Sequence, residues 1–87
     1  MKITIIYSGF LSQITGIKRE EIDIEENTTL EELLNTIYSK HHRLSEWVNR
    51  IPLIEVMVNG EPVYNPRKHV LREGDEVVLA PVLYEGG

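Results

Sequence analysis

The fold of this chain is decided by residues 27–40, which read NTTLEELLNTIYSK. Thr29, followed three positions later by Glu32, is typical of a capping box, in which each of the two side chains bonds the backbone N–H of the other residue. The apolar side chains recur at the spacing of one helix face and are Leu30, Leu33, Leu34 and Ile37. These residues predict one amphipathic helix that ends near Lys40.

Two extended segments precede this helix. Residues 3–7 alternate and carry apolar side chains on both faces, which predicts a strand in the interior of a sheet. Residues 20–25 alternate around two isoleucines, and we expect an edge strand whose acidic side chains, Glu20 included, face water as a charged rim. Residues 8–16, between the two strands, predict a connection whose large apolar side chains plug one end of the core.

The residues after the helix predict a second, short helix and then a hairpin. A helical pattern over residues 44–51 ends at Pro52, and the strongly apolar residues 54–58 follow as a strand. Asn59-Gly60 is a strong hairpin signal because both residues tolerate a positive φ. We expect the returning strand to begin at Val63.

A second turn and a last strand complete the chain. Residues 72–75 predict the turn, and residues 76–82 predict the strand. A main helix that crosses one face of a mixed sheet of about five strands, with a second short helix beside it, is an α+β fold. We expect one domain, residues 1–82, and a flexible C-terminal tail, residues 83–87.

Composition excludes several classes of function. Nine Lys and Arg residues stand against fourteen Asp and Glu residues, and the net charge of -5 would repel a phosphate backbone. The chain has no Cys, which excludes a disulfide framework, a Cys-ligated metal and a thiol nucleophile of its own. Its longest apolar run is far shorter than the ~20 residues that span a bilayer. We therefore expect a cytoplasmic protein that binds neither nucleic acid nor a membrane.

The histidines and the single tryptophan do not suggest a metal site. His41 and His42 are adjacent and point in different directions on a helix, so we expect a solvated helix end. His69 follows two basic residues, and a solvent-facing turn accounts for this cluster, with contact to an acidic patch of a partner as the alternative. Trp47 is expected to pack at the edge of the core, with partial exposure at an interface as the alternative.

Three stretches carry a family resemblance, and they are residues 7–16, 57–61 and 71–82. In this order, with Gly86-Gly87 after them, they resemble the ubiquitin-like β-grasp sulfur carriers of the MoaD/ThiS type, and in particular the small subunit of molybdopterin synthase. The resemblance covers the whole chain. It departs from the family pattern at Leu83, Tyr84 and Glu85, which make the tail longer and bulkier than usual.

The resemblance implies a chemical role for Gly87 at the end of the tail. An E1-like enzyme would use ATP to adenylate the Gly87 carboxylate, and an external sulfur donor would convert it to a thiocarboxylate for molybdopterin synthesis. The large synthase subunit would be the second partner. This chain would be a carrier that binds no cofactor or metal and is not catalytic alone.

The residues themselves suggest how the tail is used. Gly86 lacks a Cβ, so we expect it and the neighbouring Glu85 to thread a narrow tunnel in a partner. The apolar side chains just before them are expected to dock on that partner, and they are Pro81, Val82, Leu83 and Tyr84.

Four alternatives stay open at this point. The sulfur could go to a thiolated tRNA base or to thiamin, although the thiamin carriers generally lack the insertion at residues 44–51. The chain could be a protein modifier that is joined to lysine amines through Gly87. It could also be a protein-interaction domain with an inert tail.

Overall fold

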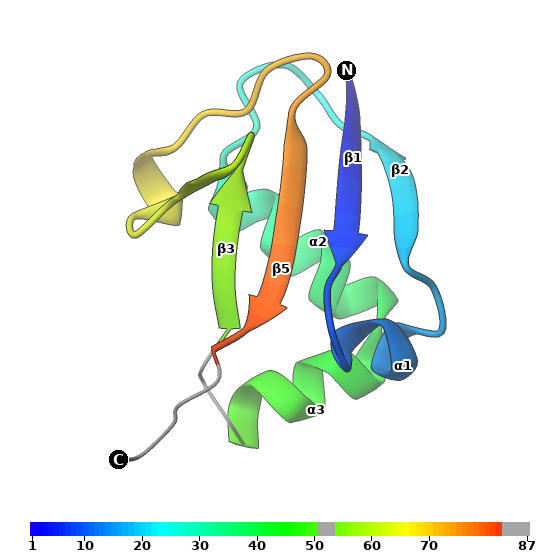
Figure 1. Ribbon diagram of the computed structural model, residues 1–87. Helices are drawn as coiled ribbons and strands as arrows, with labels where there is room; N and C mark the ends of the chain where they lie inside the picture. The colour runs from blue at the N-terminus through cyan, green and yellow to red at the C-terminus, as the bar shows by residue number, and fades with distance from the viewer. Residues whose placement is uncertain (51–53, 83–87) are drawn as a thin grey trace.

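The computed structural model describes residues 1–50 and 54–82 of this protein, and they form a five-stranded sheet with helices. The strands are β1 (Lys2–Tyr7), β2 (Arg19–Asp23), β3 (Ile54–Val58), β4 (Glu61–Pro62) and β5 (Glu76–Pro81). The helices are α1 (Leu11–Thr15), α2 (Leu30–Lys40), α3 (His42–Arg50) and the 3-10 turn η1 (Pro66–Lys68). Figure 1 shows α2 behind the sheet, with α1 and α3 at the end of the sheet where β5 terminates. Among these residues, no helix has the length and apolar character needed to cross a membrane.

The sheet is mixed and has the order β2-β1-β5-β3-β4. The central strand β5 runs parallel to β1 and antiparallel to β3, while β2 pairs with β1 in the antiparallel sense. The interior position of β1 and the edge position of β2 are confirmed. The predicted arrangement of a mixed sheet crossed by one main helix, with a second helix beside it, is also confirmed.

The hairpin after β3 is tighter than predicted. Asn59 and Gly60 have φ angles of 52° and 84°, as a two-residue turn of this kind requires. Such a turn places Glu61 directly opposite Val58, so the returning strand begins there and the prediction of Val63 as its first residue is wrong. The last strand, β5, ends at Pro81, one residue before the predicted end.

The segment between β1 and β2 is a short helix where a connection was predicted. Helix α1 ends at Gly16, whose φ of 81° is the left-handed conformation common at helix C-termini. Leu11 is buried in the core, as expected, but Phe10 is 37% exposed and so does not plug it. Five residues are too few to display a helical period, and Gly16 was the one signal of the helix end.

Helix α2 matches its prediction in detail. Thr29 Oγ1 accepts a hydrogen bond from the Glu32 N–H at 3.2 Å, and Glu32 Oε1 accepts one from the Thr29 N–H at 3.0 Å. These bonds to Thr29 lower the pKa of Glu32. The predicted apolar stripe is buried together with residues of β1 and β5, and the stripe consists of Leu30, Leu33, Leu34 and Ile37.

Candidate functional site

Of the predicted site residues, the structure describes Pro81 and Val82, at the end of the central strand β5. Leu83, Tyr84, Glu85, Gly86 and Gly87 lie outside the described residues, so their predicted roles stay predictions. Pro81 ends β5, and Val82 follows it with 38% of its surface exposed. Because β5 pairs with strands on both sides, Pro81 marks the exit point of the described chain at the end of the middle strand.

A glycine that the sequence analysis did not single out supports this exit point. Gly9 has a φ of +57°, and a Cβ at this position would lie 3.3 Å from Pro81 Cγ. The neighbouring Ser8 N–H donates to the Leu79 carbonyl oxygen at 2.9 Å. The loop between β1 and α1 is therefore hydrogen-bonded to the last residues of β5, and it lies so close to Pro81 that a Cβ at position 9 would require a small shift of Pro81.

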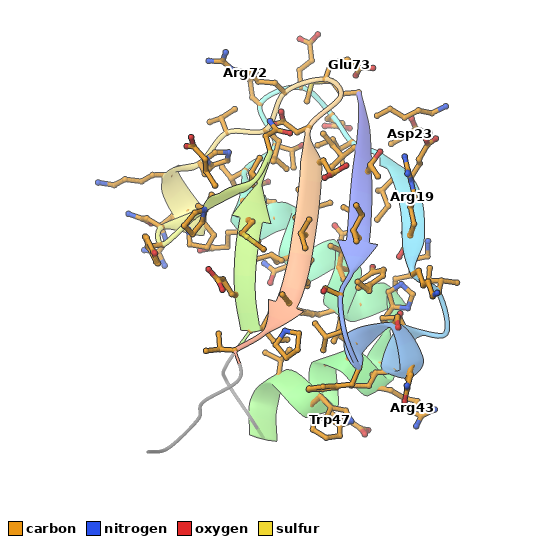
Figure 2. The ribbon with its side chains drawn as sticks, in the orientation of Figure 1. Arg19, Asp23, Arg43, Trp47, Arg72 and Glu73 are labelled. Carbon is orange, nitrogen blue, oxygen red and sulfur yellow. The ribbon has the colours of Figure 1, made fainter. Side chains whose placement is uncertain are left out.

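An apolar groove of about 540 Å³ opens beside this exit, and we call it the tail-root groove. The Phe10 and Trp47 rings lie on it with centroids 5.4 Å apart and planes tilted by 49°. Trp47 is 39% exposed and is not among the side chains that pack against the core, so the prediction that it packs at the core edge is not confirmed. Figure 2 shows Trp47 and Arg43 on α3, at the end of the molecule where β5 terminates. The groove lining consists of Phe10, Gln13, Ile14, Arg43, Trp47, Pro81 and Val82.

The face of the sheet opposite α2 carries an apolar row. Ile6 of β1 pairs with Val78 of β5, and Val78 pairs with Met57 of β3, so the three residues lie side by side across three strands. All three are half-buried. Their neighbours along each strand point into the core, where Ile5, Val77 and Val58 are buried. This row is a surface on which another protein can pack.

Glu20 of β2 is the centre of a polar cluster, which corrects the prediction that it faces water. Its side chain is only 9% exposed and accepts hydrogen bonds from Tyr7 Oη at 2.5 Å and from Lys40 Nζ. His41 Nε2 lies 2.6 Å from Glu20 Oε2, and the His41 ring packs edge-on against Tyr7. The prediction of a solvated helix end is therefore wrong for His41, whose side chain is 12% exposed.

The cluster changes the acidity of its members. Burial alone would raise the pKa of Glu20, but hydrogen bonds from Lys40, Tyr7 and His41 outweigh it and lower the pKa to about 2. Burial, and then the hydrogen bond to Glu20, raises the pKa of Tyr7. A carboxylate that already holds three partners is a poor base or nucleophile. The cluster therefore ties β1, β2 and the end of α2 together, and nothing in its geometry indicates catalysis.

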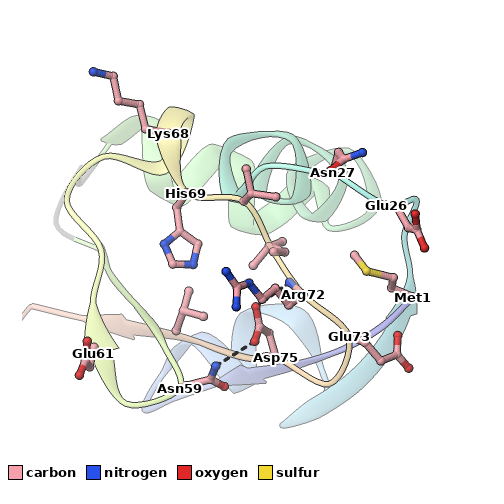
Figure 3. A pocket seen from close by; sticks show the side chains of 13 residues that line it. Met1, Glu26, Asn27, Asn59, Glu61, Lys68, His69, Arg72, Glu73 and Asp75 are labelled. Carbon is pink, nitrogen blue, oxygen red and sulfur yellow. Dashed lines mark hydrogen bonds between the residues drawn. The ribbon is translucent and has the colours of Figure 1, made fainter.

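A broad polar pocket of about 870 Å³ lies at the opposite end of the sheet (Figure 3). Asp75 at its base accepts hydrogen bonds from Asn59 Nδ2 and from the Arg72 N–H, both at 2.8 Å. His69 belongs to this lining rather than to the tail end. Within the described ranges, no buried side-chain N or O atom lacks a hydrogen-bond partner, and no group of three or more His, Asp or Glu residues is placed to hold a metal ion.

Both the fold and the family of this chain are shared with known proteins. The fold is a ubiquitin-like β-grasp, as the sequence resemblance predicted. The ThiS family profile matches residues 5–84, and the chain belongs to this family. No curated protein matches the chain in sequence.

Several solved structures share the fold over nearly the whole chain. SAMP1, a small archaeal modifier protein from Haloferax volcanii, is 21% identical with a TM-score of 0.80 and full coverage of both chains, 100% each. A putative molybdopterin converting factor subunit 1 from Pyrococcus furiosus is 22% identical with a TM-score of 0.80, over 95% of this chain and 99% of that one. A protein-protein complex of subunits 1 and 2 of the molybdopterin-converting factor from Helicobacter pylori 26695 matches at 21% identity and a TM-score of 0.69, over 99% of this chain and 100% of that one.

Proposed function

We propose that this protein is a sulfur carrier whose Gly87 carboxylate is adenylated and then converted to a thiocarboxylate, and that molybdopterin receives the sulfur. One observation carries the proposal. A ThiS-family fold ends its central strand at Pro81, at the rim of the sheet, and the sequence continues from there to Gly86-Gly87. A partner can bind a tail that follows the middle strand while the domain itself stays folded.

The chemistry needs three external reactants, which are ATP, a persulfide and a thiol. A carboxylate oxygen of Gly87 attacks the α-phosphorus of ATP, and pyrophosphate leaves as the acyl adenylate forms. A persulfide sulfur then attacks the acyl carbon and expels AMP. A second thiol reduces the resulting acyl disulfide, which leaves the thiocarboxylate on Gly87 and the donor as a disulfide.

The chain supplies neither of the groups that catalyse these steps. It has no Cys to carry the persulfide, and neither Gly9 nor Gly16 belongs to a phosphate-binding loop with a following Lys and Ser or Thr. The proposal therefore assigns adenylation to an E1-like enzyme and sulfur supply to a separate donor. This chain is their common substrate, in the cytoplasm, and has no activity alone.

Two surfaces support docking on a partner protein. The half-buried row of Ile6, Val78 and Met57 is an apolar strip on the face opposite α2. Pro81 and the exposed Val82 continue from β5 toward the tail. A partner that packs on the strip is well placed to receive the tail, and the large subunit of molybdopterin synthase is the proposed acceptor complex.

The test is the intact mass of the protein after reaction with its cognate activating enzyme, ATP and a sulfur source. The proposal predicts the mass change for exchange of one oxygen for one sulfur, and loss of that change when Gly86 and Gly87 are deleted. An unchanged mass of the full chain would contradict it. Transfer of the sulfur to the molybdopterin precursor by the large subunit, and not to thiamin or tRNA, is the second stage of the test.

A protein-modifier role is the second candidate, because the fold is shared with SAMP1 at a TM-score of 0.80. It would begin with the same adenylate at Gly87 but end in an amide bond to a lysine of another protein. Immunoblots of cell extracts decide between the two. Higher-mass conjugates that vanish on deletion of Gly86-Gly87 would favour the modifier.

A further inference from the structure

We propose that the tail-root groove receives the chain's own residues 83–85, so that the first part of the tail docks on the body of its molecule whenever no partner holds it. The inference concerns residues before the terminal glycines and does not depend on the sulfur chemistry. Three observations carry it: the exposed aromatic lining, the point where the tail starts, and the charge at the groove.

The groove exposes large apolar groups that a small domain ordinarily covers. Phe10 and Trp47 retain 37% and 39% of their exposure, and their rings lie 5.4 Å apart on the groove wall. Ile14 is half-buried beside them and packs against the core. A contiguous apolar surface of this kind marks a place where another group binds.

The tail starts on the wall of this groove. Pro81 and Val82 belong to the lining, so residue 83 follows directly from the groove itself. Three extended residues reach roughly 10 Å at ~3.3–3.6 Å each. That length exceeds the 5.4 Å between the Phe10 and Trp47 ring centroids on the groove wall.

The tail has the composition that the groove would accept. Leu83 and Tyr84 supply an aliphatic and an aromatic side chain, and Glu85 follows with a negative charge. Arg43 is the charged residue among the described lining residues. Apolar side chains on the aromatic wall, followed by a carboxylate near Arg43, give a complementary order along the chain.

Attachment to the same chain favours this occupant over a free segment. A short tether gives an effective concentration in the millimolar range, so a weak contact suffices. Gly86 and Gly87 lie beyond the docked residues and are left free of the groove in this arrangement. A partner that takes the tail would displace residues 83–85 and cover the groove itself.

Trp47 is the only tryptophan, so its fluorescence and its indole N–H resonance report on the groove alone. The double substitution Leu83→Ala and Tyr84→Ala is expected to shift the Trp47 emission to longer wavelength and to move the indole resonance. Deletion of Gly86 and Gly87 is the matched control and is expected to leave both signals unchanged. Identical Trp47 signals in the wild type and the double variant would overturn the proposal.

A charge exchange tests the order of residues along the groove. Arg43→Glu alone is expected to weaken docking of the tail. When Arg43→Glu is combined with Glu85→Arg, docking is expected to return. The Trp47 signals of that protein should again change when Leu83→Ala and Tyr84→Ala are added. Signals that depend on protein concentration would show the tail of a second copy in the groove and would overturn docking within one chain. The deletion of Gly86-Gly87 also separates the two proposals, because it abolishes the sulfur chemistry while the Trp47 signals stay.

Discussion

The two ends of the central strand differ in their surface groups: polar groups with hydrogen-bond partners lie at one end, and exposed aromatic rings lie at the other. At the start of β5, Asp75 accepts hydrogen bonds from Asn59 and Arg72, and Asn59 Oδ1 accepts the Glu76 N–H at 2.9 Å. At the end of β5, the groove leaves the Phe10 and Trp47 rings partly in water. At the first end, the polar groups form hydrogen bonds with one another and stabilise the fold. At the second end, aromatic surface stays exposed and is available for contact with another group. The difference supports the proposal that a partner binds at the end of β5 from which the tail continues.

The largest effect on stability is expected at the bonded end. Asp75→Ala leaves the Asn59 amide and the Arg72 N–H, both in partly buried hydrogen bonds, without their acceptor, which costs about 1–3 kcal/mol of the free energy of unfolding. Urea denaturation measures the loss. Asp75→Asn keeps one acceptor oxygen and is the matched control, with a smaller loss. If Asp75→Ala unfolds as the wild type does, the contrast between the two ends is wrong.

The next effect concerns acid stability. The pKa of Glu20 is about 2 in the folded protein and 4.5 ordinarily, so its contribution is complete above about pH 5 and is lost as the pH falls toward 2. Glu20→Gln is expected to lower stability at neutral pH and to make it fall less steeply on acidification. Thermal melts of both proteins across this range measure the effect. Parallel pH profiles would contradict the buried ion cluster.

A smaller effect is expected where the loop meets the end of β5. Gly9→Ala must adopt a φ of +57°, which costs about 1–2 kcal/mol, and its Cβ would press on Pro81 at 3.3 Å. Gly16→Ala carries the same backbone cost at φ +81° with no neighbour within 4 Å. Of the two variants, we expect only Gly9→Ala to slow adenylation of Gly87 by the activating enzyme. Equal rates of Gly87 adenylation for the two variants would show that the contact between residue 9 and Pro81 does not affect recognition by the activating enzyme.

The smallest effect on stability is expected at Val82. Val82→Asp changes a side chain that is 38% exposed, so the free energy of unfolding should move by only about 0.5 kcal/mol. The same variant is expected to reduce adenylation of Gly87, because a carboxylate enters an apolar contact surface. Unfolding curves and adenylation kinetics on one preparation test both parts. A stability loss that matches the activity loss would refute a contact role.

The sequence predicted the elements whose signals are local. The Thr29–Glu32 capping box and the Asn59-Gly60 turn depend on neighbouring residues, and both occur as expected. The Glu20 cluster was missed because its partners are distant along the chain, at positions 7, 40 and 41. One signal was present, since Glu20 is two residues before Ile22 and shares its inward face. The tail-root groove depends on how α3 packs beside α1, which no local pattern encodes.

The central claim is that sulfur is carried on Gly87, and the most direct measurement is tandem mass spectrometry of the protein isolated from its own cells. The chain contains no Cys, so no persulfide on the protein itself can mimic the signal. The account predicts a C-terminal peptide in which one oxygen of Gly87 is replaced by sulfur. A C-terminus that contains only oxygen, in cells that are actively making the cofactor, would contradict it.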